Sequence, residues 1–434
     1  MSPSRNAVLL AGALLAVALL VAAGLVPRVL LHYSLILVAG LAMLDLLWSL
    51  CRPDPEVARH IRGTLVQGLA RTVTVSIRNR SEHELRLLVH DHHPHSFDCD
   101  GQPMVARVAP MRALELQYQL LPRERGAHRF GPVQCRVLSP LRLWWRDRYP
   151  YAGETYRVYP NFAAVHDLET VGSEQREART GVKRLRRRGE GSEFHQLREY
   201  RAGDALARID WRATARSRKL ISREYQDERD QCILFLLDCG RRMRSKDGLL
   251  SHFDQALNAL LLLSHVALKE GDSVGLLTFG GSQTWLPPAK GQSALRRLLN
   301  ATYALQPDLQ MPDYEQAAVQ LLRRHGKHAL VIVLTNLRDE DGNDVLEAAR
   351  HLQARHRVLV ASLREQALDR ALRSLPDEPE EALLVAAARY YDQRRGRALR
   401  RLEGHGVLTL DSLPGLLGVH LLRLYRSLKA QGAL

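Results

Sequence analysis

Two apolar runs near the N-terminus constrain this chain more than any other feature. Residues 8–26 contain no charged side chain, and after Pro27 and Arg28 a second apolar run extends over residues 29–50. Each run is long enough to cross about 30 Å of hydrocarbon as a helix. A cleaved signal peptide is the alternative for the first run, but the second run directly after it favours a membrane hairpin. So short a connector places both ends of the hairpin on one side of the bilayer.

The basic residues around the hairpin indicate which side that is. Arg5 precedes the pair of runs, Arg52, Arg59 and Arg62 follow it, and the connector offers only Arg28. The positive-inside rule therefore places the termini and everything after the hairpin in the cytoplasm.

One acidic residue, Asp45, lies within the second run. A carboxylate in the hydrocarbon is costly and can mark a functional relay. Because Asp45 lies near the end of the run and close to Trp48, we expect it at the membrane interface instead.

The composition of the 434 residues is that of a globular chain, with 46% hydrophobic and 25% charged residues. The formal net charge is +15, and the five cysteines are dispersed without a Cys-x-x-Cys pair. This pattern indicates a reducing compartment and no cysteine-based metal site, and nothing in the sequence indicates a cofactor.

A strand-rich module is predicted for residues 59–165, after a hairpin region of residues 1–55. Short alternating runs are separated by Pro and Gly, as in a small β-sandwich. The expected strands cover 72–77, 85–89, 114–120, 133–138 and 156–159. Four histidines surround Asp91 at positions 90, 92, 93 and 95, and the nearby Pro94 favours a loop over a metal site.

A basic connector is predicted for residues 166–226. Between Arg176 and Arg223 there are fifteen Lys or Arg and six Asp or Glu. The centre of this basic patch is formed by Arg184, Arg186, Arg187 and Arg188. Anionic lipid, an acidic protein partner and nucleic acid are the possible ligands, and nucleic acid is disfavoured because aromatic stacking residues and a helix-turn-helix or zinc module are lacking.

The same connector carries the most distinctive motif. Residues 203–204 form a turn signal, Asp210 is expected to cap a helix that begins at Trp211, and residues 220–225 should be extended. Here the sequence resembles the bacterial domain-of-unknown-function-58 (DUF58) family, whose hallmark combines Tyr-x-x-Gly-Asp with Ile-Asp-Trp and Ala-Arg. The matching residues are Tyr200, Gly203, Asp204, Ile209, Asp210, Trp211, Ala215 and Arg216. These residues have two possible roles. They could recognise a partner, or they could only fix the connector to the next domain.

Strands and helices alternate over residues 227–434, which predicts a doubly wound, mostly parallel sheet. The expected strands cover 232–238, 273–279, 329–335, 358–363 and 407–410, and the expected helices cover 253–270, 293–305, 314–324, 345–355, 382–403 and 416–430. Ligands of such sheets bind beyond the carboxyl ends of the strands, which directs attention to Asp238 and Thr335.

The resemblance implies that this region is a von Willebrand factor A-like domain. Such domains commonly hold a divalent cation with Asp-x-Ser-x-Ser and a later Thr and Asp, whereas Gly240 and Arg242 stand at the two Ser positions here. We therefore expect no metal, with Asp238 either paired to a guanidinium or capping the sheet edge. The predicted partner-binding residues are Asp238, Arg241, Arg242, Thr335 and Asn336.

No catalytic motif is visible, neither a P-loop nor a nucleophile elbow nor a zinc-protease helix, so we expect no enzyme. The resemblance implies an adaptor in the bacterial inner membrane that works with a MoxR-type AAA+ ATPase in the assembly or maturation of other proteins. A cation-dependent ligand-binding protein, with Mg²⁺ at Asp238 and Thr335, and a nucleic-acid-binding protein are the alternatives.

Overall fold

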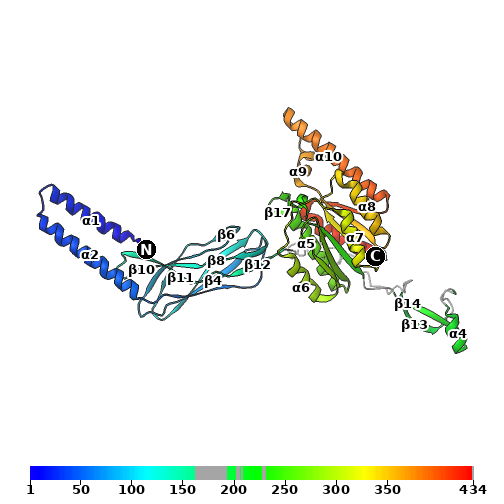
Figure 1. The fold of residues 1–434 in the computed structure, drawn as a ribbon, viewed down its shortest axis with the longest axis horizontal. Helices are drawn as coiled ribbons and strands as arrows, with labels where there is room; N and C mark the ends of the chain where they lie inside the picture. Colours follow the sequence, from blue (N-terminus) through cyan, green and yellow to red (C-terminus); the bar gives the residue numbers. More distant parts are fainter. Residues whose placement is uncertain (162–192, 202–205, 207–208, 227–230, 433–434) are drawn as a thin grey trace, which may run out of the picture. The chain divides into compact units, whose positions relative to one another are not determined.

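The computed structural model describes residues 1–161, 193–201, 206, 209–226 and 231–432. The chain divides into two compact units, Met1–Asn161 and Phe162–Leu434 (Figure 1). The basic patch at residues 184–188 lies outside the described residues, as do Gly203 and Asp204 of the hallmark.

The first unit begins with two apolar helices, α1 (Arg5–Ala22) and α2 (Arg28–Cys51). At 1.5 Å per residue they are about 27 and 36 Å long, and both are long and apolar enough to cross a bilayer. The connector between them, residues 23–27, is longer than the sequence predicts, because α1 ends before the end of its apolar run. Ser4 caps α1 by accepting hydrogen bonds from the backbone N–H groups of Asn6 and Ala7.

The rest of this unit consists of strands. Three sheets have the orders β1-β11-β10-β5-β7, β2-β4-β8-β6 and β3-β12-β9. The strands are β1 (Ser2–Pro3), β2 (Glu56–Ile61), β3 (Leu65–Val66), β4 (Arg71–Arg78), β5 (Leu85–Asp91), β6 (Phe97–Asp100), β7 (Met104–Val108), β8 (Ala113–Pro122), β9 (Gly126–Arg129), β10 (Val133–Leu138), β11 (Trp144–Tyr151) and β12 (Thr155–Tyr159). The five expected strands are all present, and alternate residues of the two larger sheets share one hydrophobic core.

A buried ion pair lies inside this core. The guanidinium of Arg59 pairs with the carboxylate of Asp91, which also accepts a hydrogen bond of 2.7 Å from the Tyr118 hydroxyl. The loop expected around Asp91 is therefore wrong at this residue, which ends β5 and points inward. Arg59 contributes its charge to the core and not to the flank of the membrane hairpin.

The second unit contains a six-stranded sheet of order β19-β18-β15-β20-β21-β22. Its strands are β15 (Cys232–Asp238), β18 (Ser273–Phe279), β19 (Trp285–Ala289), β20 (Leu330–Thr335), β21 (Arg357–Leu363) and β22 (Leu408–Ser412). All neighbouring pairs are parallel except β18 and β19. The sequence prediction missed β19, which contains Pro287 and Pro288 and lies at the sheet edge, where proline is tolerated.

Helices cover both faces of this sheet. One core combines the sheet with α5 (His252–Lys269), α6 (Gly291–Thr302) and α11 (Leu417–Ala430). The opposite core combines it with α7 (Tyr314–Arg324), α8 (Gly342–Gln353) and α10 (Pro379–Gly404). Successive strand residues alternate between the two cores, which explains why these strands are continuously apolar in sequence.

A separate two-stranded sheet is formed by β13 (Glu193–Glu199) and β14 (Ile221–Gln226), which pair antiparallel. Between them lies α4 (Trp211–Ser217), and the predicted cap is confirmed because the Asp210 side chain accepts from the N–H groups of Arg212 and Ala213. The extended segment expected at 220–225 is confirmed as well.

Candidate functional site at the carboxyl edge of the sheet

Asp238 and Thr335 meet at the carboxyl edge of the sheet, because β15 and β20 are parallel neighbours that end there. The Thr335 hydroxyl donates to Asp238 Oδ2 at 2.7 Å, and the N–H of Gly240 donates to Oδ1 at 2.7 Å. The Tyr314 hydroxyl lies 2.9 Å from Thr335 Oγ1. The side chains of Asp238, Thr335 and Tyr314 are all buried. The two groups that donate hydrogen bonds to the Asp238 carboxylate are uncharged.

Backbone segments close over the Asp238 carboxylate. A Cβ atom on Gly240 would lie 3.0 Å from Asp238 Oδ1 and 3.0 Å from the carbonyl oxygen of Gln310. A Cβ on Gly280, whose φ is +74°, would lie 3.1 Å from Oδ1 and 3.2 Å from Pro312 Cα. Glycine at these two positions therefore allows three loops to pack against the carboxylate.

Burial raises the pKa of Asp238 to about 6, although the hydrogen bonds from Thr335 and Gly240 and the positive charge of Arg242 oppose the shift. Burial likewise raises the pKa of Tyr314, with the Asp238 charge as a further cause. A substantial part of the Asp238 population is therefore neutral near pH 6.

The two arginines after Asp238 do not pair with it among the residues that the structure describes, which contradicts the expected ion pair. Arg242 lies in the short 3-10 helix η2 (Arg241–Arg244), and its guanidinium contacts Glu340 at 3.0 Å and also pairs with Asp341. Arg241 is exposed. Asp238 thus agrees with the other expectation, a residue that closes the sheet edge through hydrogen bonds.

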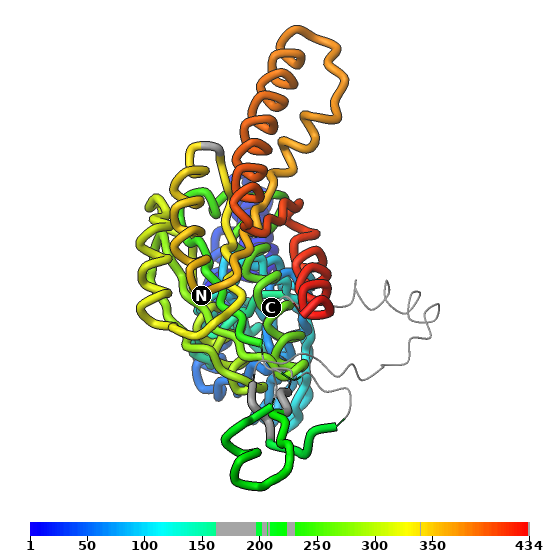
Figure 2. The backbone as a smooth tube through the Cα atoms, turned by 90° about the vertical axis from the view of Figure 1, so that its right-hand side faces the viewer, coloured from blue at the N-terminus to red at the C-terminus, as the bar shows by residue number. Residues whose placement is uncertain are grey.

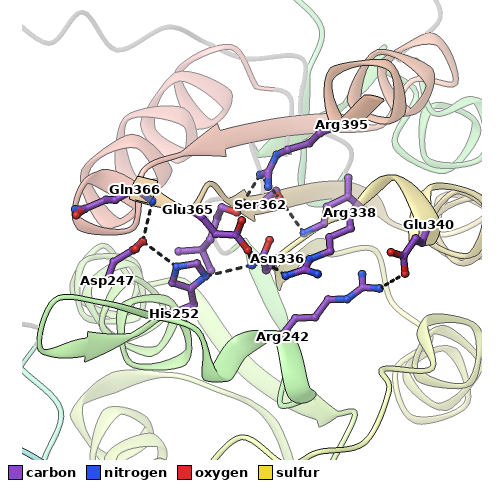
Figure 3. A network of polar contacts seen from close by, with 12 residues as sticks. Arg242, Asp247, His252, Asn336, Arg338, Glu340, Ser362, Glu365, Gln366 and Arg395 are labelled. Atoms are coloured by element: carbon purple, nitrogen blue, oxygen red, sulfur yellow. Dashed lines mark hydrogen bonds and ion pairs between the residues drawn. The ribbon is translucent and has the colours of Figure 1, made fainter. Parts of the chain in front are cut away.

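A second network includes Asn336, the residue after Thr335, at the same edge of the sheet (Figure 3). His252, buried at the start of α5, contacts Asp247 Oδ2 through Nε2 at 2.9 Å and Asn336 Nδ2 through Nδ1 at 3.2 Å. Asn336 Nδ2 also donates to Glu365 Oε1 at 3.2 Å, which Arg338 contacts at the same distance. Because Asn336 donates, His252 Nδ1 accepts and Nε2 carries the proton that faces Asp247.

This network holds the base of a helical arm formed by α9 (Gln366–Arg373) and α10. The N–H of Gln366 donates to Asp247 Oδ2 at 3.1 Å, which fixes the first residue of α9. Arg395 of α10 is buried and donates to Ser362 Oγ at 2.7 Å and to the Leu363 carbonyl at 3.0 Å, and it pairs with Asp411 at 2.6 Å. Asp247, which follows β15, is thereby tied to α9, and the carboxyl ends of β21 and β22 are tied to α10.

The far end of the arm stands away from the other helices of its unit (Figure 2). Its large apolar side chains are between 61% and 87% exposed: Leu375, Leu383, Leu384 and Tyr390. Residues 374–384 contain four acidic residues and no basic one. The sequence predicts the helix, but the exposure of its apolar side chains became visible only in the structure.

Four of the five predicted partner-binding residues are buried: Asp238, Arg242, Thr335 and Asn336. Arg241 is exposed. The four buried side chains organise the sheet edge, and the exposed apolar side chains of this unit described above lie on the arm. Sequence analysis missed Asp247, His252, Glu365 and Arg395. The only signal for the first three is a polar residue beside the end of a helix or strand, and Arg395 lies inside α10 without such a signal.

The hallmark residues that the structure describes lie on the β13–α4–β14 element. Ile209 is buried and bridges to Ser222, and Asp210, besides capping α4, accepts from Arg223 Nε at 2.8 Å. The backbone N–H of Tyr200 donates to Leu220 at 2.8 Å. Trp211 is 68% exposed, and Ala215 and Arg216 are exposed as well. Ile209 and Asp210 therefore stabilise the element locally, while Trp211 faces outward.

The chemistry available at these positions is limited. Among the described residues, no group of three or more His, Cys, Asp or Glu side chains is arranged to hold a metal ion. The polar side chains of the network are mostly committed to one another, and the Asp238 carboxylate is covered by backbone.

Comparison with known proteins gives a family of unknown function. Residues 196–399 match the family model described as "Protein of unknown function DUF58". The chain is 25% identical to the "Uncharacterized protein YeaD" of Bacillus subtilis (strain 168) over 305 residues, which cover 69% of this chain and 73% of that protein.

Similarities to solved structures are weak. A FixG-related protein from Vibrio parahaemolyticus matches with a TM-score of 0.19 and 10% identity, over 24% of this chain and 97% of that one. The alpha-2-macroglobulin fragment from Escherichia coli matches with a TM-score of 0.20 and 11% identity, over 82% of this chain and 50% of that one. Scores this low carry no argument about fold or function.

Proposed function

We propose that this protein is a membrane-anchored adaptor that binds a MoxR-type AAA+ ATPase and supports the assembly or maturation of other proteins without catalysing a reaction itself. The single observation that carries the proposal is the α9–α10 arm, which presents large apolar side chains to solvent on a base fixed by a polar network. Exposed apolar clusters of this kind are typical of protein-binding surfaces.

The anchor in this proposal is the pair α1 and α2, which place both of their outer ends on one side. Arg5 at the start of α1 and Arg52 and Arg62 after α2 outnumber Arg28, which stands at the other end of the hairpin as the first residue of α2. This excess supports a cytoplasmic location for the larger parts of the chain. The proposed site of action is thus the cytoplasmic face of the bacterial inner membrane.

The α/β unit is proposed to be a von Willebrand factor A-like domain that lacks the metal of its relatives. The strand order and the helices on both faces support this assignment. The replacement of both serines after Asp238 by Gly240 and Arg242, and the packing of backbone over the carboxylate, favour recognition without a cation.

The chemistry of the arm tip favours a protein over a lipid surface. Its four acidic side chains would be repelled by anionic lipid headgroups, whereas a protein groove with an apolar floor and a basic rim would complement the tip. If the partner assembles from several copies, it would present such a groove more than once, and one weak contact would be reinforced by others.

Crosslinking in native membranes followed by mass spectrometry tests the proposal. We expect a MoxR-type ATPase to be recovered with the wild-type chain, with crosslinks to the arm. Replacing Leu383 and Leu384 together by serine should reduce recovery at least thirtyfold, since central apolar contacts contribute about 2 kcal/mol or more.

The matched control is Leu249→Ser, which removes a leucine of similar exposure, 66%, elsewhere in the same unit. Recovery with this control should equal that of the wild type. Equal recovery with the Leu383/Leu384 double variant would exclude the arm as the binding surface, and failure of the wild type to recover any such ATPase would exclude the partnership.

A further inference from the structure

A pocket of about 350 Å³ lies in the first unit, where the C-terminal end of α2 meets the strand module. Its lining includes Arg52 directly after α2, Arg86 of β5, and Arg142 of the loop between β10 and β11. The single carboxylate in the lining is Glu84, so the pocket has a formal excess of two positive charges.

In the described part of the chain the Asp45 carboxylate acts on Arg52 through its charge, whereas Arg86 and Arg142 have at most a distant acidic partner. Arg86 approaches Glu84 only to 4.0 Å, and neither Arg52 nor Arg142 has a carboxylate within 4.0 Å among the residues that the structure describes. The Nε of Arg52 is buried without a hydrogen-bond partner. An anion in the pocket would complement the charges of the three guanidinium groups.

The carboxylate of Asp45, which also lies nearby, is already committed. It accepts hydrogen bonds of 2.6 Å from the Ser139 hydroxyl and of 2.9 and 3.3 Å from the N–H groups of Leu141 and Leu143. These bonds attach α2 to the loop that carries Arg142. The loop is therefore held against the helix, and the pocket is formed by fixed elements.

The level of this pocket in a membrane follows from the length of α2. About twenty helical residues cover about 30 Å of hydrocarbon, and the twentieth residue counted from Val29 is Trp48. Trp48 is a pocket residue, and the guanidinium carbon of Arg52 lies 5.7 Å from the centre of its ring. Tryptophan favours the boundary between hydrocarbon and headgroups, so the arginines lie at the level of the lipid phosphates.

We propose that this pocket binds the phosphate of an anionic phospholipid headgroup from the leaflet that contacts the strand module. Guanidinium groups provide paired donors that match phosphate oxygens. The exposed side chains of Trp48 and Leu141 border the arginines and provide an apolar surface that a lipid can cover and a free phosphate cannot. The inference depends on the membrane anchoring that is part of the proposed function, but not on the ATPase partner.

Lipid retention by the full chain, solubilised in mild detergent and measured by native mass spectrometry, tests the site. Phosphatidylglycerol and phosphatidylcholine with the same acyl chains are the probes, and the thermal stability of the chain is measured with each lipid and with inorganic phosphate alone. We expect phosphatidylglycerol to be retained preferentially and to raise the unfolding temperature, whereas inorganic phosphate at the same concentration should leave it unchanged.

The variants are Arg52→Gln and Arg142→Gln, singly and together, with Arg112→Gln as a control of equal charge change outside the pocket. Each pocket variant should retain phosphatidylglycerol about fivefold less, because one basic residue at this level contributes about 1 kcal/mol, and the double variant about 25-fold less. The control should match the wild type.

Equal retention of the two lipids by the wild type, or unchanged retention by the double variant, would overturn the proposal. An equal stabilisation by inorganic phosphate would identify a free anion as the ligand and would also overturn it. Because Arg142 is exposed and its side chain forms no hydrogen bond or ion pair within the described part of the chain, Arg142→Gln should fold even if Arg52→Gln does not. Resistance of the same variants to alkaline extraction from membranes tests the anchor separately.

Discussion

Replacing Asp238 by asparagine separates the charge of this side chain from its shape. The carboxylate is buried, and its two hydrogen-bond donors, Thr335 and Gly240, are uncharged. An asparagine in the same position can accept from Gly240 through Oδ1 and donate to Thr335 through Nδ2. The Thr335 hydroxyl can then donate to Tyr314, so no polar atom loses its partner.

The magnitude follows from the pKa. Burial raises the pKa of Asp238 from 3.8 to about 6 in the folded chain, and a difference of about two units corresponds to about 3 kcal/mol. Because the folded pKa lies above the unfolded one, the stability that this group contributes is present in full below pH 3.8 and is lost as the pH rises through 6. Asp238→Asn, which stays neutral, should be more stable than the wild type by about 3 kcal/mol at pH 8 and equally stable near pH 4.

Hydrogen exchange of the β15 amides at several pH values measures this difference in stability for the α/β unit. The amides of a central strand exchange only when the whole unit unfolds, so their exchange rate reports its free energy of opening. The matched control is Asp272→Asn. Asp272 is also buried, but it pairs with Lys429 at 2.7 Å, so its neutralisation removes one of the two carboxylates, Asp272 and Glu270, that pair with this ammonium group. The control should lower the opening free energy at pH 8, opposite in sign to Asp238→Asn.

A loss of stability in Asp238→Asn at pH 8 would refute this reasoning, because it would mean that the folded chain favours the charged carboxylate. If Mg²⁺ also stabilised the wild type and not the variant, the cation-dependent alternative would replace the proposed metal-free domain.

Three further substitutions test individual contacts. Asp91→Asn should lower the free energy of unfolding of the strand module by about 3–5 kcal/mol, because it leaves the Arg59 charge buried without its partner, and urea unfolding of the full chain in detergent measures this loss. Asp45→Ala should cost about 1–3 kcal/mol through the lost contact with Ser139 and expose the adjacent loop to proteolysis. Asp210→Ala should cost about 1 kcal/mol through the lost helix cap, seen as faster hydrogen exchange of the α4 amides.

The central elements of the α/β unit were predictable because their apolar pattern is dictated locally. The strand predicted for 232–238 coincides with β15, and the helix predicted for 314–324 coincides with α7. The edge strand β19 was not predictable from the sequence. It is half-buried and contains two prolines, and this pattern by itself indicates a loop. The five-residue connector of the hairpin was also missed, because the apolar run continues past the last residue of α1.

The candidate site was predictable only where the sheet geometry determines it. Parallel neighbouring strands bring Asp238 and Thr335 to one edge whatever their surroundings. The direction of the Arg242 side chain was predicted wrongly, because it depends on acidic residues in a loop about one hundred positions later in the chain. Glu365 and His252 were missed for the same reason, since only the fold brings their loops together.

Three buried aspartates differ in the groups that stabilise their carboxylates. Asp91 is neutralised by a guanidinium 32 positions away, whereas Asp45 and Asp238 have hydroxyl and backbone donors, with Ser139 and Thr335 lying 94 and 97 positions away. A paired charge stabilises one arrangement over a wide pH range, whereas burial without a paired charge raises the pKa of Asp238 to about 6. Asp238 lies at the same edge of the sheet as the residues that hold the base of the arm, and its protonation state changes near pH 6.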